Sequence, residues 1–245
     1  MSNFTEKSNI NQQLTEGKVI NSTLLEVQKM WRVFYADSNS VFELRALWPK
    51  GVPSTKKPIY KYYWTSEYPS LDACKKAFEH DALALNAKGF NIYTVMNPIC
   101  SSVGGEGATK DVDIQYRDLL LVDIDRTGET SEPATDAEVG AAKSLASQIR
   151  MFMDSCGWPS PIVVMSGNGY HLYYLLVDVC NDKASTDLVK SVLNELAAKF
   201  DNATVSVDTS VYNAARITKV PGTIMRKGMA SDNRPYRMAE VCDEL

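Results

Sequence analysis

Residues 117–125 have the sequence Arg-Asp-Leu-Leu-Leu-Val-Asp-Ile-Asp, an apolar run that ends in two carboxylates separated by one residue. Side chains alternate between the two faces of a β-strand, so Asp123 and Asp125 are expected to share a face. Two neighbouring carboxylates repel each other unless a proton or a cation lies between them, and oxygen ligands suit Mg²⁺ or Mn²⁺. The stretch therefore predicts either a divalent-metal site or a strand end that dips into solvent.

The composition is that of an ordinary globular protein. The chain has 245 residues, of which 44% are hydrophobic and 23% charged, enough for one large domain or two small ones. No apolar run approaches the ~20 residues of a membrane-spanning helix, and residues 1–7 lack the apolar core of a signal peptide. We therefore expect a cytoplasmic protein with no membrane partner.

Cysteine and histidine are too scattered to indicate a zinc site. The five cysteines include no Cys-x-x-Cys pair, and the only histidines are His80 and His171. We predict reduced thiols, no disulfide framework and no zinc.

Charge is unevenly distributed along the chain, although the net charge is only −4. Residues 211–237 contain a single acid, Asp232. The basic residues of the same segment are Arg216, Lys219, Arg226, Lys227, Arg234 and Arg237. This local excess indicates an anionic partner, although a solvated basic face would have the same composition.

The first half of the chain alternates helical and strand patterns. A helix, a strand, a second helix and a second strand are expected, in this order, at residues 21–34, 41–47, 71–88 and 90–96. Ser22 and Ser70 are the expected N-caps of the two helices. The proline-rich residues 48–69 are predicted to form a long connection, whose aromatic side chains either stack on bases or pin the loop to the body.

The second half has the pattern β-α-β-β-α-β. Its strands and helices are expected, in order, at 117–125, 136–155, 162–165, 171–177, 183–200 and 204–207. This is the split βαβ arrangement of ferredoxin-like and RNA-recognition folds, so the predicted fold class is α/β, in its α+β form. The predicted organisation is a flexible leader (1–20), an N-terminal αβ module (21–112) and a C-terminal RNA-recognition-like module (113–245), together one catalytic domain.

Chain topology gives the two carboxylates their neighbours. Right-handed crossovers place the first and third strands side by side at the centre of the sheet, with the fourth beside the first. Asp123 and Asp125 would then lie between His171 on one side and Asp208 on the other. Tyr173 shares the open face with His171, while the opposite face packs on the helices.

Three carboxylates on one face suit two-metal chemistry. Asp123, Asp125 and Asp208 could hold two divalent ions about 4 Å apart, an arrangement that activates an attacking 3′ oxygen and stabilises the leaving pyrophosphate. Nucleases and phosphatases use the same device with water as the nucleophile. Asp208 is also an ordinary turn or cap residue, so its place in the set depends on its neighbours.

Two further segments could bind phosphate. In Ser166-Gly-Asn-Gly-Tyr-His171, a hydroxyl and an imidazole flank a glycine turn whose amides can face an anion, although an ordinary hairpin turn also needs glycine. After Asp208, the chain brings Arg216 and Lys219 towards the expected metal site.

These residues, in this order, resemble the three motifs of the archaeo-eukaryotic primase superfamily. The motifs are Asp123-x-Asp125, Ser166-Gly-x-Gly-x-His171 and Val207-Asp208 followed by Ala215-Arg-Ile217 and Lys219-Val-Pro-Gly-Thr223. The chain most resembles the small primase-polymerase branch found on plasmids, in phages and at CRISPR loci, over residues 40–230. Phe42-Glu-Leu-Arg45 and Asn91-Ile-Tyr-x-x-x-Asn97-Pro98 add a weaker similarity.

The resemblance implies a catalytic cleft between the two modules and a role for each matching residue. Asp123, Asp125 and Asp208 are implied to be ligands of Mg²⁺ or Mn²⁺. Contacts to the incoming nucleotide are implied for Ser166, His171, Arg216, Lys219 and, less directly, Lys227. Implied partners are a single-stranded or primed DNA template, dNTP or NTP, and a fused or associated helicase or CRISPR protein. Many relatives carry a zinc knuckle, and the cysteines and histidines of this chain could not build one.

We therefore predict a template-dependent nucleotidyltransferase, a DNA primase-polymerase with Asp123, Asp125, Asp208 and His171 as its catalytic residues. A metal-dependent nuclease or rolling-circle initiator on the same fold is the first alternative. The second is a non-catalytic nucleic-acid-binding module that stacks bases on sheet aromatics such as Tyr173.

Overall fold

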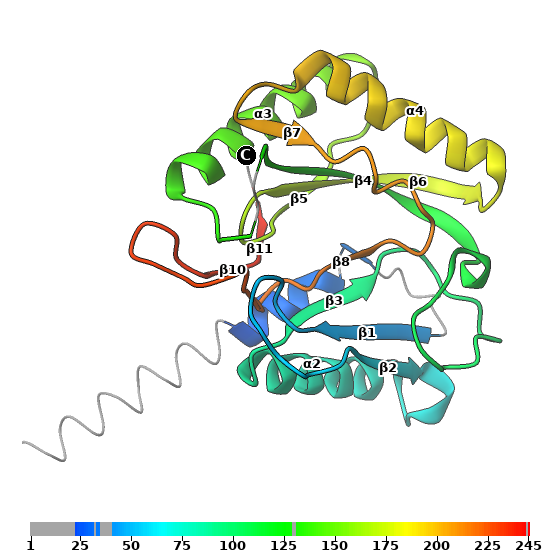
Figure 1. Ribbon diagram of the computed structural model, residues 1–245. Coiled ribbons are helices and arrows are strands. Elements are labelled where there is room, and N and C mark those ends of the chain that lie inside the picture. Colours follow the sequence, from blue (N-terminus) through cyan, green and yellow to red (C-terminus); the bar gives the residue numbers. More distant parts are fainter. Residues whose placement is uncertain (1–22, 32, 35–40, 129–130, 244) are drawn as a thin grey trace, which may run out of the picture.

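Two antiparallel sheets, one of five strands and one of four, face each other across the molecule (Figure 1), and a third sheet has only two strands. The structure, a computed structural model, describes residues 23–31, 33–34, 41–128, 131–243 and 245. Helices α3 and α4 cover the outer side of the larger sheet, and α2 covers the outer side of the smaller one. The inner sides of both sheets are therefore available to form a site between them.

The larger sheet has the strand order β11-β5-β6-β4-β7. Its strands are β4 (Tyr116–Arg126), β5 (Ile162–Met165), β6 (Tyr170–Cys180), β7 (Val205–Val207) and β11 (Glu240–Cys242). Its helices are α3 (Asp136–Ser155) and α4 (Lys183–Phe200). The predicted order is confirmed, with β4 and β6 at the centre and β7 beside β4. The added edge strand β11 was not predicted, because three residues carry little periodic signal.

Alternation along the central strands separates the core from the inner face. Leu120, Val122 and Ile124 of β4 are fully buried with Leu172 and Tyr174 of β6, in the core that also contains the buried faces of α3 and α4. Asp123 and Asp125, which follow Val122 and Ile124, therefore point to the opposite, inner face. Burial of the apolar side of β4 thus fixes the direction of its carboxylates.

Helix limits agree closely with the sequence signals. Helix α3 begins after a capping box, in which Thr135 Oγ1 accepts from the Glu138 N–H and the Glu138 carboxylate accepts from the Thr135 N–H. Helix α4 begins after Asp182, whose side chain accepts from the Ser185 N–H. No helix in the part of the chain that the structure describes is long and apolar enough to cross a membrane.

The smaller sheet has the order β2-β1-β3-β8. Its strands are β1 (Val41–Leu47), β2 (Ile59–Trp64), β3 (Asn91–Val95) and β8 (Ile217–Lys219). Helix α2 (Leu71–Ala87) packs on this sheet and is capped by Ser70, as predicted. The remaining short elements are η1 (Thr65–Glu67), η2 (Asp111–Asp113), β9 (Ile224–Met225) and β10 (Arg237–Met238).

The prediction of one long connection over residues 48–69 was wrong, because β2 lies within it. Prolines before the strand suggested a loop, but β2 is an edge strand, where neighbouring prolines are tolerated. The aromatic side chains of this strand pin the 101–110 connection. Tyr62 Oη donates to the Gly107 carbonyl at 3.2 Å, and a Cβ on Gly105 would lie 2.4 Å from the Trp64 ring.

Strand β8 belongs to the smaller sheet although it follows β7 in the chain. It pairs with β3, so that Tyr93 lies opposite Lys219 and Val95 opposite Ile217. The basic segment after Asp208 therefore crosses from the larger sheet to the smaller one. This crossing places it along the inner face of both.

Residues 23–31 and 33–34 are helical and pack against both sheets. The Trp31 ring lies 5.1 Å from that of Phe42, and Phe34 meets Tyr173 edge-on at 5.1 Å. The leader predicted at 1–20 and the predicted cap Ser22 lie outside the described residues.

Candidate active site

A pocket of about 310 Å³ lies between the inner faces of the two sheets. It brings together most of the site residues expected from the sequence: Asp123, Asp125, Ser166, His171, Arg216, Lys219 and Lys227. Asp208 is outside its lining. Tyr93, Asn168, Thr218 and Met225 also line the pocket and were not expected there.

Asp123 is at the centre of the site. It lies opposite His171 in the β4–β6 register, and its carbonyl accepts from the Asp208 N–H at 2.8 Å. Its Oδ1 is 3.3 Å from His171 Nε2. Burial opposes ionisation of this carboxyl, but His171 and then Arg216 and Lys227 together hold its pKa below the ordinary value. Asp123 is thus a half-buried carboxylate that its cationic neighbours keep charged.

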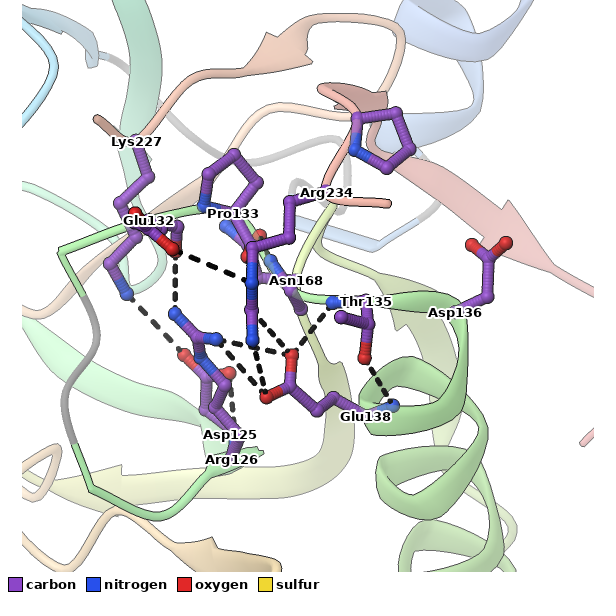
Figure 2. Close-up of polar contacts among 12 residues, drawn as sticks. Asp125, Arg126, Glu132, Pro133, Thr135, Asp136, Glu138, Asn168, Lys227 and Arg234 are labelled. Carbon is purple, nitrogen blue, oxygen red and sulfur yellow. Dashed lines mark hydrogen bonds and ion pairs between the residues drawn. The ribbon is translucent and has the colours of Figure 1, made fainter. Parts of the chain in front are cut away.

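Asp125 differs from Asp123 in the direction of its pKa shift. Lys227 Nζ lies 3.9 Å from its Oδ2, as Figure 2 shows. Burial, reinforced by the charge of Asp123, nevertheless raises the pKa of Asp125 above its ordinary value. The same burial lowers the pKa of Lys227. The two carboxylates of β4 therefore repel each other, and Lys227 only partly offsets the repulsion.

We expect Asp125→Asn to raise the thermal midpoint of the metal-free protein at neutral pH. A carboxyl whose pKa is raised by folding contributes stability at low pH, and this contribution is lost as the pH rises through the folded-state pKa. Asparagine removes the charge and keeps an acceptor for the Arg126 N–H, now 2.8 Å from Oδ1. Calorimetry in EDTA should show a gain of roughly 2 to 4 °C per kcal/mol of repulsion removed. An unchanged or lower midpoint would contradict this electrostatic picture.

Asp208 adjoins the pair but its carboxylate is directed elsewhere. Its Oδ1 accepts from the Ser210 N–H at 2.8 Å, and its Oδ2 lies 3.5 Å from Arg216. Among the described residues, no three His, Cys, Asp or Glu side chains are arranged to hold a metal ion. The structure thus brings Asp208 beside Asp123 through the backbone, with its side chain paired to Arg216.

The turn between β5 and β6 places Ser166 and His171 on the pocket wall. The Ser166 N–H donates to the Gly169 carbonyl at 2.9 Å, and Gly167 has a φ of +105°, which favours glycine. A Cβ on Gly167 would also lie 2.5 Å from that of Met225. Asn168 Oδ1 accepts from the Ala134 N–H at 2.8 Å and so ties the turn to the start of α3.

Buried asparagines hold the segment that carries Lys227. Asn91 exchanges two hydrogen bonds with the backbone of Arg226, at 2.7 and 2.8 Å. Asn86 does the same with Ile224, at 2.9 Å each. These contacts join residues more than a hundred positions apart, which a local sequence pattern does not reveal. Their effect is to fix the backbone immediately before the lysine that meets Asp125.

Lys219 forms a buried part of the pocket wall. Its side chain donates to the Ile224 carbonyl at 3.2 Å and lies 5.6 Å from the centre of the Tyr93 ring. The residue is 2% exposed, and burial together with Arg226 lowers its pKa well below the ordinary value. Lys219 therefore lies at the site as predicted, but with little access to solvent.

A cluster of charged residues, Arg126, Glu138 and Arg234, lies behind Asp125 and Lys227 (Figure 2). Both Arg126 and Arg234 contact both Glu138 oxygens, at 2.8 to 3.3 Å. None of the three was predicted to be a site residue, although Arg234 belongs to the basic segment 211–237. The cluster joins β4, the start of α3 and the loop before β10, and so supports the wall of the pocket that carries Lys227.

Replacing Glu138 by glutamine should destabilise the protein at neutral pH. Although burial opposes ionisation, the hydrogen bonds from the Thr135 N–H, Arg234 and Arg126 lower the Glu138 pKa to about 2. The stability that this charge contributes is present above the ordinary glutamate pKa and is lost as the pH falls towards 2. Urea unfolding at pH 7 should show a loss of roughly 1 to 3 kcal/mol, shrinking with acidification.

Asp187→Asn provides the control, because its pair with Lys183 on α4 is solvent-exposed. That change should cost less than about 1 kcal/mol. Equal free energies of unfolding for the wild type and Glu138→Gln at pH 7 would contradict the role given to the cluster.

Comparison with known proteins finds similarity at the level of structure. No protein-family model matches the sequence, and no curated protein sequence matches it. The crystal structure of primase RepB′ is 13% identical, with a TM-score of 0.49, over 91% of this chain and 56% of that one. The polymerase domain of Mycobacterium tuberculosis Ligase D in complex with DNA is 16% identical, with a TM-score of 0.47, over 89% and 80%.

The chain thus spans a little over half the length of the primase RepB′ chain.

Proposed function

We propose that the chain is a template-dependent nucleotidyltransferase, a primase-polymerase that extends a 3′ hydroxyl or starts a primer. One observation carries the proposal. A single pocket holds paired carboxylates on β4 and, facing them, the cationic residues Arg216 and Lys227. Such a site suits a substrate that brings both an anion and the cations bound to it, as a nucleoside triphosphate does.

The cationic side of the pocket would bind the triphosphate. Arg216, which is half-buried, and Lys227 supply positive charge close to Asp123, since both lower the pKa of that residue. Ser166 offers a hydroxyl from the β5–β6 turn, and His171 Nε2 faces the same space. In this proposal these four side chains hold and orient the phosphates, while Lys219 supports the wall beneath them.

The acidic side fits a hard divalent cation. Asp123 and Asp125 offer oxygen donors on one face of a strand, and burial together with their mutual repulsion raises the pKa of Asp125. Asp208 would join them after turning from Arg216, because its backbone already adjoins Asp123. Mg²⁺ or Mn²⁺ held there would supply the charge that activates the attacking hydroxyl and stabilises the leaving pyrophosphate.

The two sheets would belong to two modules with different roles. The larger sheet with α3 and α4 would be the catalytic module, and the smaller sheet with α2 the N-terminal module that closes the cleft. The template strand would enter along the cleft, where the basic segment crosses between the sheets. Tyr173 is 1% exposed with its hydroxyl engaged, which argues against base stacking on that residue and so against a purely binding module.

The test is an assay on labelled single strands, primed and unprimed, with dNTPs and NTPs supplied separately in Mg²⁺ or Mn²⁺. We expect strands that lengthen only when nucleotides matching the template are present. The unprimed arm reports initiation, and the separate nucleotide pools report sugar preference. Cleavage of the labelled strand without nucleotides would instead identify a nuclease and overturn the proposal.

A further inference from the structure

Two buried hydroxyls lie directly behind the His171 ring. Tyr173 Oη is 2.8 Å from His171 Nδ1, and Thr218 Oγ1 is 3.3 Å from the same atom. The two hydroxyls are also hydrogen-bonded to each other. Tyr173 and Thr218 are 1% and 2% exposed, so water does not compete for these contacts.

The two hydroxyls come from different sheets. Tyr173 lies two residues after His171 on β6 and therefore on the same inner face of the larger sheet. Thr218 lies on β8 of the smaller sheet, opposite Thr94. The Tyr173 ring also packs edge-on against the ring of Phe34. The chain of hydroxyls is thus a junction between the two sheets at the wall of the pocket.

The acceptors and donors fix the direction of this chain when the His171 ring is neutral. The Asp123 carboxylate can only accept, so the ring proton must lie on Nε2 and point to Asp123. Nδ1 then accepts from the Tyr173 hydroxyl, which in turn accepts from Thr218. Every polar atom from Thr218 to Asp123 then has a partner.

We infer that Tyr173 and Thr218 are positioning residues that hold the His171 ring with its Nε2–H directed into the pocket. The inference rests on the proposed function, in which this N–H, directed to Asp123 in the free site, donates to a phosphate oxygen of the incoming nucleotide once Asp123 binds the cation. Thr218 belongs to the smaller sheet. The orientation of the His171 ring therefore also depends on how the two sheets pack against each other.

The test uses substitutions that remove one hydroxyl at a time. Tyr173→Phe and Thr218→Val should each raise the KM for the incoming nucleotide roughly five- to thirtyfold, with a smaller change in kcat. Thr218→Ser keeps the hydroxyl and should restore the wild-type KM. Tyr174→Phe is the matched control, since its buried hydroxyl has no hydrogen-bond partner among the described residues. Unchanged KM values in Tyr173→Phe and Thr218→Val would overturn the inference.

Nitrogen-15 spectra of the histidine rings give a readout that does not need activity. The chain has two histidines, and His80→Gln identifies the signals of His171. At alkaline pH the wild type should show His171 protonated on Nε2 alone, and Tyr173→Phe should show a mixture of the two tautomers. Identical spectra in both would overturn the positioning role. Failure of the wild type to incorporate nucleotides would overturn only the proposed function, because the spectra decide the positioning separately.

Discussion

Asp123→Asn should lower nucleotide incorporation by more than ~100-fold, because even the outer partners of metal ligands are typically worth roughly 10- to 100-fold. Asp123 lines the pocket and is the carboxylate kept ionised by His171, Arg216 and Lys227. Asparagine has nearly the same shape but no charge, so it should weaken the proposed cation binding without opening a cavity. Steady-state extension of a primed template, with saturating nucleotide, measures the effect.

The control for this change is Asp187→Asn, which removes an exposed charge on α4 away from the pocket. It should extend the primer at the wild-type rate. Circular dichroism should show that Asp123→Asn keeps the native fold. A folded Asp123→Asn protein with near-wild-type incorporation would remove Asp123 from the catalytic set.

Gly169→Ala should reduce both stability and activity. A Cβ at this position would lie 2.1 Å from the Ile124 carbonyl oxygen and 3.2 Å from the Asp125 Cα, and both contacts are with backbone atoms. Ile124 cannot move without shifting β4 and with it Asp125. Overpacking of this kind typically costs about 1 to 3 kcal/mol, and a backbone contact places this case at the upper end. Urea unfolding and primer extension measure the two effects.

Gly140→Ala is the matched control on α3. No atom would lie within 4 Å of its Cβ, so the change should be neutral or stabilise by up to about 1 kcal/mol. If Gly169→Ala were as stable as Gly140→Ala, the β5–β6 turn would not be in the close contact with β4 that positions Asp125.

The fold around the site was predictable where apolar periodicity decides it. Residues 117–125 alternate between core and inner face, and α3 and α4 have clear caps and amphipathic spacing. Right-handed connections then leave one arrangement for the central strands, and this places His171 opposite Asp123. These features follow from short-range sequence patterns, which is why they could be predicted together.

Other parts of the site depend on contacts between distant residues. Nothing in the local sequence around Asn91 shows that its amide holds Arg226, or that Glu138 gathers Arg126 and Arg234. The same holds for β8, three residues long, which joins the smaller sheet rather than continuing the larger one. Side-chain direction is equally non-local, as the pairing of Asp208 with Arg216 shows.

The most direct measurement is extension of a labelled primer on a single-stranded template in Mg²⁺ or Mn²⁺, by the wild type and by a variant carrying Asp123→Ala and Asp125→Ala. We predict templated extension by the wild type, with one pyrophosphate released per nucleotide added, and none by the variant. Equal extension by both proteins, or none by the wild type, would contradict the claim that these two carboxylates carry out nucleotidyl transfer.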